Sequence, residues 1–366
     1  MNLIMKNAPA VFAVGNDYKI FIQTNESALV WVKVGGECYF DHSNGIIRSG
    51  SNMHKVSVPS EVLDEEKKYT VYFRKMIERK PYFSLTGAEE EEVFAFNPLP
   101  KEKFNIFQVA DAHGMIDQPA AAAKIFEAEV GKIDLLVLNG DVIDHSGKIE
   151  NFDAIYKITS LITGGEIPAV FSRGNHDTRG IYAENIADYT PTRDGFSYFS
   201  FRISGLWGLV LDCGEDKEDS HEEYANTICC HAFRKEETRY LENVVKNAAN
   251  EYGAEGVTRK LIFAHSPFTQ RFTAPFNIEE DTYAYWTKLI RENIQPDAML
   301  CGHTHRFAIN RPGDEKDAYG ASWPIVVASQ PNTKDRHFAG GGLSVDTDKI
   351  TAVFCNEEKV ISKEVL

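Results

Sequence analysis

The sequence lacks several features that would place the protein in a specialised class. No stretch approaches the roughly 20 apolar residues of a membrane-spanning helix, and residues 1–7 lack the apolar core of a signal peptide. The six cysteines form no C-x-x-C pair and no disulfide framework, so we expect free thiols in a reducing compartment. These absences predict a cytoplasmic protein without a membrane partner.

Positive charge is also scarce in the chain. Its 366 residues include 39 lysines and arginines against 54 aspartates and glutamates, which gives a formal net charge of −15. A general nucleic-acid binder would have a basic surface, so nucleic acid is not the expected partner. Hydrophobic residues make up 43% of the chain, enough for a full core, and the length allows two domains.

What the chain does contain is a series of five short polar blocks. The blocks are Asp111-Ala-His113, Gly140-Asp141-Val-Ile-Asp144, Gly174-Asn175-His176-Asp177, His265 and Gly302-His303-Thr-His305. Taken alone, a Gly-Asp or Gly-Asn pair is an ordinary turn, and a single buried histidine is a core or capping residue. Five such blocks in one order would require five unrelated accidents.

Each block directly follows an apolar run rich in valine, isoleucine and leucine. The runs are residues 104–110, 133–140, 167–174, 261–264 and 298–302. Continuous apolar runs of this length predict strands that are buried on both faces. Side chains at the carboxyl ends of such strands meet in the crevice where open α/β sheets bind ligands. We therefore expect the five blocks to form one cluster in space.

The cluster would offer oxygen and nitrogen ligands, because no block contains a cysteine. Such mixed ligands suit Mn, Fe, Zn or Co, whereas Mg is less favoured by imidazoles. Two ions about 3.5–4 Å apart clamp phosphate oxygens and lower the pKa of a bridging water. An imidazole that titrates near neutral pH suits protonation of a leaving alkoxide. The chemistry that fits is hydrolysis of a phosphate ester at two divalent or trivalent metal ions of unassigned identity.

The series resembles the calcineurin-like metallophosphoesterase superfamily, whose pattern is D-x-H, G-D-x-x-D, G-N-H-[DE], a lone H and G-H-x-H. All five blocks match, and the resemblance extends from about residue 104 to the C-terminus. The resemblance implies seven metal ligands. They are Asp111, His113 and His305 for the first ion, Asn175, His265 and His303 for the second, and Asp141 as the bridge between both.

Three further residues are predicted to act in catalysis. The resemblance implies that His176 protonates the leaving oxygen and that Asp144 orients His176 or a ligand. Arg179, shortly after His176, is a candidate clamp for phosphate oxygens because arginine contacts them bidentately. The alternative for Arg179 is a surface residue that closes a loop. Purple acid phosphatases have tyrosine and glycine where this chain has Asp144 and His113, so we expect no tyrosinate–iron site.

The first hundred residues have a different pattern. Short β-rich runs at residues 18–23, 28–34, 54–58 and 69–74 alternate with turn-prone stretches. Several short strands at this spacing predict an antiparallel sandwich. Trp31 and the spacing between Leu63 and Tyr69 resemble the fibronectin type III pattern, in which a tyrosine packs back on the preceding corner.

We therefore predict a layered α/β (α+β) fold in two domains. A small immunoglobulin- or fibronectin-like all-β sandwich would occupy residues 1–97, and prolines and charges predict a linker at 98–103. Residues 104–366 would form the catalytic domain, for which the resemblance implies a two-sheet β-sandwich flanked by helices. The clearest helical stretch is 118–130, with Asp117 as the expected N-cap.

Two functions from different classes follow from these observations. The first is a phosphomonoesterase or phosphodiesterase with a metal-bridging hydroxide as nucleophile and His176 as general acid. The second is a catalytically silent metal-binding protein whose N-terminal sandwich recognises a partner. The complete ligand set favours the enzyme, because a dead site has no chemical reason to keep every ligand. An acidic segment at residues 211–224 is expected to lie over the site and to repel bulky polyanions.

Overall fold

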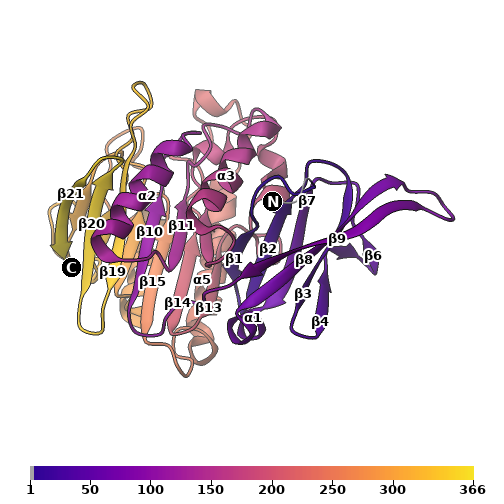
Figure 1. The fold of residues 1–366 in the computed structure, drawn as a ribbon. Helices are drawn as coiled ribbons and strands as arrows, with labels where there is room; N and C mark the ends of the chain where they lie inside the picture. Colours follow the sequence, from indigo (N-terminus) through magenta and orange to yellow (C-terminus); the bar gives the residue numbers. More distant parts are fainter. Residues whose placement is uncertain (1–3) are drawn as a thin grey trace.

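Two large sheets dominate the computed structural model, which describes residues 4–366 (Figure 1). The first sheet has the strand order β21 (Val360–Val365), β20 (Ile350–Asn356), β19 (Ala339–Val345), β10 (Phe104–Val109), β11 (Leu135–Asn139), β12 (Ala169–Ser172), β1 (Ala10–Val14), β2 (Asp17–Gln23) and β7 (Met53–Pro59). The second has the order β13 (Phe199–Ile203), β14 (Leu206–Leu211), β15 (Arg259–Ala264), β16 (Ala298–Cys301), β18 (Ile325–Val327) and β17 (Ala308–Asn310).

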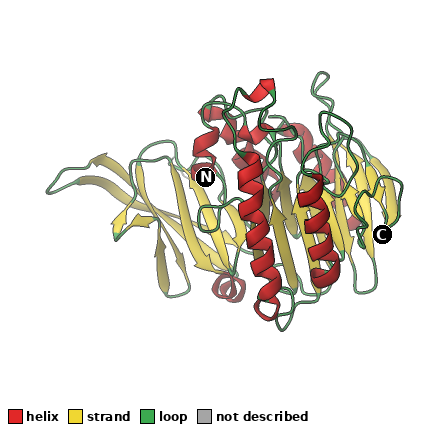
Figure 2. Ribbon diagram, turned by 180° about the vertical axis from the view of Figure 1, so that it is seen from behind, coloured by secondary structure: helices red, strands yellow, loops and turns green. Residues whose placement is uncertain are grey.

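The two sheets face each other, and helices cover their outer faces. Buried side chains of both sheets, such as Val137 and Leu300, belong to one continuous core. Helices α2 (Asp117–Val130) and α3 (Asp153–Thr163) pack on the nine-stranded sheet (Figure 1). Helices α5 (Cys230–Lys246) and α6 (Glu280–Leu289) pack on the six-stranded sheet, and Figure 2 shows the helices from behind. This arrangement confirms the predicted layered fold.

The strands that carry the polar blocks run parallel in the centre of each sheet. Strands β10, β11 and β12 pair in parallel in the first sheet, and β14, β15, β16 and β18 do so in the second. Parallel strands are buried on both faces and therefore consist of continuous apolar residues. Their carboxyl ends consequently lie along one edge of the layered core.

An all-β region precedes these strands, as predicted. It contains β1 to β9, including the four-stranded sheet β4 (Glu37–Phe40), β3 (Ala28–Val34), β8 (Lys68–Glu78) and β9 (Leu85–Ala95), the pair β5 (His42–Ser43) and β6 (Ile46–Ile47), and helix α1 (Ser60–Glu66). The sheet of the catalytic part continues into this region, since β1 pairs in parallel with β12 through Phe12 and Ala169. The fibronectin-like assignment and the division at residues 97–104 stay predictions.

Tyr69 provides a further contact between the two parts of the chain. Its buried hydroxyl donates a hydrogen bond to the carbonyl of Gly165, which follows α3, at 2.7 Å. The sequence had predicted that this tyrosine packs back on the preceding corner of its own sandwich. The hydroxyl instead links strand β8 of the all-β region to the turn that follows α3.

Some helix boundaries differ from the predicted ones. Asp117 is the first residue of α2 and lies in its first turn, whereas the N-cap position belongs to Ile116 without a side-chain cap. A carboxylate in the first turn is still favourable there, because it interacts with the positive end of the helix dipole. No helix among residues 4–366 is long and apolar enough to cross a membrane.

A buried histidine in β7 should make the stability of the protein pH-dependent. His54 is fully buried, and neither ring nitrogen has a hydrogen-bond partner among the described residues. Burial lowers its pKa from 6.5 to about 4. Between these pH values the unfolded chain binds a proton on His54 that the folded chain excludes. The contribution of His54 to the free energy of unfolding is therefore fully present above pH 6.5 and is lost as the pH falls from 6.5 to 4. The loss from this group amounts to about 3 kcal/mol.

The variant His54→Leu should show a smaller loss of stability over the same pH range. Urea unfolding followed by circular dichroism at several pH values measures this difference directly. Carboxylates titrate equally in both proteins, so the difference between the two curves isolates His54. Parallel curves would show that His54 does not contribute.

Candidate metal centre

The five polar blocks lie in the loops that directly follow five central strands. Asp111 follows β10, Asp141 follows β11 and Asn175 follows β12, while His265 follows β15 and His303 follows β16. Because these strands end on the same edge of the two facing sheets, residues nearly 200 positions apart in sequence approach each other, as the 3.2 Å between Asp111 and His305 shows. The structure thus brings the predicted ligands together.

The backbone is unusual at five of the seven predicted ligands. Positive φ angles occur at Asp111 (54°), His113 (44°), Asp141 (51°), His303 (69°) and His305 (52°). A residue other than glycine in this conformation costs about 1–3 kcal/mol and persists only where its surroundings enforce it. Such strain concentrates at functional sites, and its coincidence with the predicted ligands supports a functional role for this cluster.

Hydrogen bonds between the loops maintain these strained conformations. The amide of Asp111 donates to the carbonyl of Gly140 at 3.0 Å, and the amide of His113 donates to the carbonyl of Asp141 at 2.9 Å. The amide of His303 donates to Oδ2 of Asp111 at 2.9 Å. Each of these loops is therefore held by hydrogen bonds to a neighbouring loop. The predicted metal-binding side chains are thus positioned before an ion binds.

The first group of predicted ligands consists of Asp111, His113 and His305. Oδ1 of Asp111 lies 3.2 Å from Nε2 of His305, and Nε2 of His305 lies 3.4 Å from Nε2 of His113. One ligand atom from each residue lies within 4.8 Å of the others. Nδ1 of His113 is buried without a hydrogen-bond partner among the described residues. Two imidazole nitrogens that face each other beside a carboxylate suit a shared cation better than a hydrogen bond.

The second group of predicted ligands, Asn175, His265 and His303, lies next to Asp141. Oδ2 of Asp141 is 3.1 Å from Nε2 of His265, and Nδ1 of His303 is 3.0 Å from Oδ1 of Asn175. If the amide of Asn175 is turned over, its nitrogen donates to Nδ1 of His303 and to Oδ2 of Asp141 instead. A cation bound between these groups would attract the amide oxygen of Asn175, so we would expect Oδ1 to point toward it.

His265 shows how strongly this cluster favours positive charge. The ring is buried, and its Nδ1 donates to the carbonyl of Asn139 at 2.7 Å, which directs Nε2 toward the two carboxylates. Burial alone would lower the pKa of His265, but the charges of Asp141 and Asp111 raise it to about 10. Two buried carboxylates that share one imidazole offer oxygen and nitrogen atoms of the kind that divalent metal ions bind.

The structure places the three predicted catalytic residues beside the cluster. Nδ1 of His176 donates to the backbone carbonyl of Asp144 at 2.9 Å, so the main chain of Asp144 orients this ring. The carboxylate of Asp144 is largely exposed and lies 3.8 Å from Nδ1 of His113. Nη1 of Arg179 lies 3.4 Å from Nε2 of His176. All three residues therefore adjoin the predicted site.

Arg179 is held by carboxylates of the acidic segment. Its Nε and Nη2 donate to the two carboxylate oxygens of Glu215 at 2.8 and 2.9 Å. Glu223 lies 3.5 Å from Nη1. The hydrogen bonds to Glu215 raise the pKa of Arg179 further above its usual range. The guanidinium is thus fixed beside His176, and its Nη2 also lies 3.1 Å from the side-chain amide of Asn175.

Asp177 supports the centre in a way that the sequence analysis overlooked. Its Oδ2 accepts hydrogen bonds from the amides of Gly174 at 2.7 Å and Asp141 at 3.3 Å. The side chain is fully buried, and this burial together with the charge of Asp141 raises the pKa of Asp177 to about 7. Its position as the last residue of the third block was the signal that could have identified it.

Gly174 allows the second and third blocks to approach closely. A Cβ atom at this position would lie 2.2 Å from Oδ1 of Asp141 and 2.4 Å from its backbone nitrogen. We expect Gly174→Ala to displace Asp141, to destabilise the protein by about 1–3 kcal/mol, and to lower metal content. Thermal unfolding and elemental analysis measure the two effects. Gly36→Ala is the control, because a Cβ there meets no atom within 4 Å; equal behaviour of both variants would contradict the prediction.

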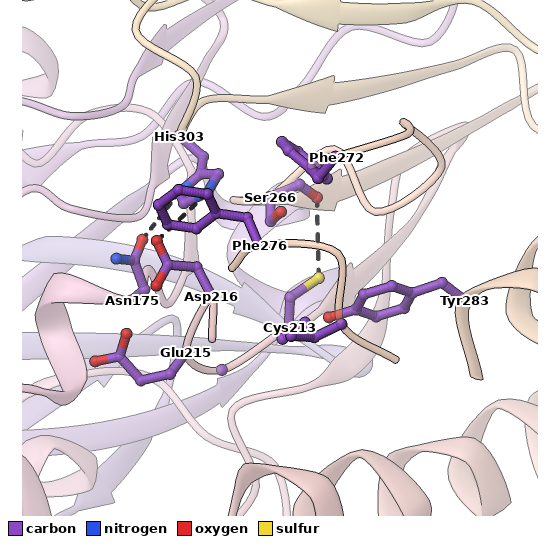
Figure 3. Close-up of a pocket in the computed structure, with 11 residues that line it drawn as sticks. Asn175, Cys213, Glu215, Asp216, Ser266, Phe272, Phe276, Tyr283 and His303 are labelled. Atoms are coloured by element: carbon purple, nitrogen blue, oxygen red, sulfur yellow. Dashed lines mark hydrogen bonds and ion pairs between the residues drawn. The ribbon is translucent and has the colours of Figure 1, made fainter. Parts of the chain in front are cut away.

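A hollow borders the cluster on the side of Asn175 and His303 (Figure 3). Its lining residues are Asn175, Cys213, Gly214, Glu215, Asp216, Ser266, Phe272, Phe276, Ile278, Tyr283 and His303. Aromatic and aliphatic side chains form one wall, and two carboxylates of the acidic segment form another. That segment therefore lies at the edge of the predicted site.

Comparisons with known proteins agree with this geometry. A model of the calcineurin-like phosphoesterase family matches residues 104–307. The serine/threonine-protein phosphatase CPPED1 of Bos taurus is 28% identical over 151 residues, which cover 39% of this chain and 43% of that protein. The match thus spans less than half of that relative. The structure of purple acid phosphatase PPD1 from yellow lupin (Lupinus luteus) seeds has a TM-score of 0.61 and 13% identity, covering 99% of this chain and 74% of that one.

These comparisons differ in what they establish. At 13% identity, the likeness to the lupin phosphatase concerns the fold alone. The match to the family model establishes family membership, because it covers more than half of the chain and contains all five polar blocks. On this evidence, the chain belongs to the calcineurin-like phosphoesterase family.

Proposed function

We propose that the protein hydrolyses phosphate esters at a dinuclear metal centre. The observation that carries the proposal is the overlap of three potential ligand groups, Asp111–His113–His305, His113–Asp141–His176 and Asp111–Asp141–His265, within each of which the ligand atoms lie within 4.8 Å of one another. Such overlapping groups would provide two adjacent cation positions with shared carboxylates. A dinuclear centre is also what the family implies.

The seven predicted ligands would hold the two ions, with Asp141 between them. Bound ions supply charge neutralisation for the phosphate and a water of lowered pKa. The protein contributes fixed geometry: Asp141 has one oxygen toward His265 and accepts a hydrogen bond from the amide of His176 at 2.8 Å through the other. Because these groups are already oriented, little reorganisation is needed when the substrate binds.

His176 would act as the general acid. Its Nδ1 donates to the carbonyl of Asp144, so Nε2 is the nitrogen available to the substrate. A proton on Nε2 would pass to the ester oxygen as the bond between this oxygen and phosphorus breaks. Nη1 of Arg179, at 3.4 Å from Nε2, would contact a phosphate oxygen at the same place.

The proposal is tested with metal-stripped protein that is reloaded with Mn, Fe, Zn or Mg. Hydrolysis of p-nitrophenyl phosphate and bis-p-nitrophenyl phosphate is then compared for each metal. We expect activity to return with at least one metal, and the ratio of the two substrates separates a monoesterase from a diesterase. Bound metal without any turnover would overturn the proposal and favour the metal-binding recognition protein.

The cellular location stays a prediction of the sequence. All six cysteines are free thiols in the structure, as expected for a reducing compartment. We propose a cytoplasmic location, and cell fractionation followed by immunoblotting tests it. Recovery in a membrane or secreted fraction would contradict it.

A further inference from the structure

The hollow beside Asn175 and His303 lies next to both the predicted second ion and the predicted general acid. Asn175 and His303 form part of its wall. Glu215 lines it as well, and the Glu215–Arg179 ion pair connects this wall to Nε2 of His176. If phosphate binds at the metal cluster, the organic group of the ester has this hollow as its neighbour. The walls of the hollow should therefore select that group.

The rim of the hollow has one uncompensated negative charge. Three carboxylates, Glu215, Asp216 and Glu223, surround two cations, Arg179 and Lys217. Both carboxylate oxygens of Glu215 already accept hydrogen bonds. Arg179 donates to each of them, and the hydroxyls of Thr178 and Tyr224 donate one hydrogen bond each. The uncompensated charge must therefore be sought on another carboxylate of the rim.

Asp216 directs one carboxylate oxygen to the hollow. Oδ1 interacts with the ammonium of Lys217 at 3.2 Å and lies 3.0 Å from the hydroxyl oxygen of Tyr224. Oδ2 lies 3.9 Å from Nε2 of His303, beyond hydrogen-bond distance. Figure 3 shows this carboxylate between Glu215 and His303. Asp216 thus has one carboxylate oxygen that faces the hollow beside the predicted ligand His303.

The same part of the structure already accommodates an ammonium group. Nζ of Lys217 lies 5.3 Å from the ring centroid of Phe276 and 5.7 Å from that of Tyr224. The side chain of Lys217 is only 12% exposed, and Glu223 lies 2.8 Å from Nζ. Aromatic rings attract cations through the negative charge of their faces. Carboxylates and aromatic rings at this rim therefore form a favourable environment for an alkylammonium ion.

We propose that the hollow lined by Asp216, Phe272 and Phe276 binds the organic group of a phosphate ester that carries a positively charged amine. This inference rests on the proposed phosphoesterase function and names its substrate class. In the reaction, the oxygen of water bonds to phosphorus and the bond between phosphorus and the ester oxygen breaks. The amino alcohol leaves with a proton on that oxygen, and inorganic phosphate is the second product.

The composition of the lining also disfavours anionic organic groups. Among the described residues that line the hollow there is no lysine or arginine. A second carboxylate or phosphate on the substrate would face the carboxylate of Asp216, whose neighbouring ammonium, that of Lys217, is already shared with Glu223. The acidic segment selects against polyanions through this residue.

Three esters of similar size test the proposal with metal-loaded protein. Phosphoethanolamine has an ammonium group, propyl phosphate has a methyl group in its place, and phosphoglycolate has a carboxylate. We expect kcat/KM for phosphoethanolamine to exceed that for propyl phosphate about tenfold, which corresponds to a typical contact between a cation and an aromatic or acidic group. Phosphoglycolate should be the poorest substrate. If the p-nitrophenyl assays indicate a diesterase, the p-nitrophenyl diesters of the three alcohols are used.

Two variants locate the effect. Asp216→Asn should reduce the ratio of kcat/KM between phosphoethanolamine and propyl phosphate to about one. Glu218→Gln removes the same charge from an exposed position of the same segment and should keep the wild-type ratio. Equal kcat/KM values for the three esters, or a wild-type ratio in Asp216→Asn, would overturn the inference while hydrolysis of p-nitrophenyl phosphate leaves the proposed function intact.

A binding measurement separates this inference from catalysis. Isothermal titration of metal-free protein with ethanolamine should show weak binding that Asp216→Asn abolishes and Glu218→Gln preserves. If no ester is hydrolysed with any metal, the proposed function fails, and the titration alone decides about the hollow. Binding that depends on Asp216 would then support the ammonium site, and its absence would refute it.

Discussion

Replacing Asp141 by asparagine is expected to abolish phosphatase activity and to release at least one metal ion. Oδ2 of Asp141 lies 3.1 Å from Nε2 of His265, and Oδ1 accepts the amide hydrogen of His176. Asparagine keeps the size of the side chain but replaces one negatively charged oxygen by an NH2 group. A side chain that held two cations would need the full negative charge of a carboxylate, which asparagine lacks. Charge stabilisation by metal ions contributes several kcal/mol to the transition state, so kcat should fall about 10³-fold or more.

The measurement combines steady-state hydrolysis of p-nitrophenyl phosphate with metal analysis of the purified protein. We expect two ions per chain in the reloaded wild type and one or none in the variant. Asp348→Asn makes the same chemical change at an exposed position and should retain both the ions and the activity. If Asp141→Asn keeps two ions and loses less than about tenfold in kcat, Asp141 does not bridge the metals.

The layered fold could be predicted because its information is local. Each central strand is a continuous apolar run, and each run ends at a polar block. Period and composition identify such strands without knowledge of their neighbours. The convergence of the blocks then follows from the general position of ligands at the carboxyl ends of parallel strands.

The continuation of the nine-stranded sheet into the first 97 residues could not be predicted in this way. The pairing of β1 with β12 joins residues about 157 positions apart, as the partners Phe12 and Ala169 show. Nothing in the sequence of β1, Ala10–Val14, specifies that it will pair with β12, because a fully buried apolar strand fits several neighbours. The contact of Tyr69 with Gly165 depends on this pairing and was missed for the same reason.

The candidate site shows a similar division between local and long-range information. The predicted ligands could be named because each stands in a short pattern of its own. The contacts of Arg179 could not be predicted, since Glu215 lies 36 positions away in an irregular loop. Asp144 illustrates another limit: its backbone carbonyl orients His176, and the sequence identifies side chains, not the groups of the main chain that make hydrogen bonds.

His176→Asn provides the second large effect, and its size should depend on the leaving group. Nδ1 of His176 donates to the carbonyl of Asp144, and Nε2 lies next to Nη1 of Arg179. Asparagine can replace the first hydrogen bond but cannot transfer a proton. General acid catalysis contributes about 10²–10⁴-fold, so kcat with an alkyl phosphate should fall by that factor. The loss with p-nitrophenyl phosphate should be much smaller, because p-nitrophenolate leaves without protonation.

The dependence on the leaving group separates a proton donor from a metal ligand. Ligand atoms of His176, His113 and Asp141 lie within 4.8 Å of one another, so His176 is also close enough to hold an ion. As a ligand, it would lower the metal content on replacement and reduce the rates for both substrates alike. As an acid, it would leave two ions in place and affect mainly the alkyl ester. His145→Asn, at a half-exposed neighbouring ring 3.9 Å from Asp144, should change neither quantity, because this ring lies outside every group of potential ligands.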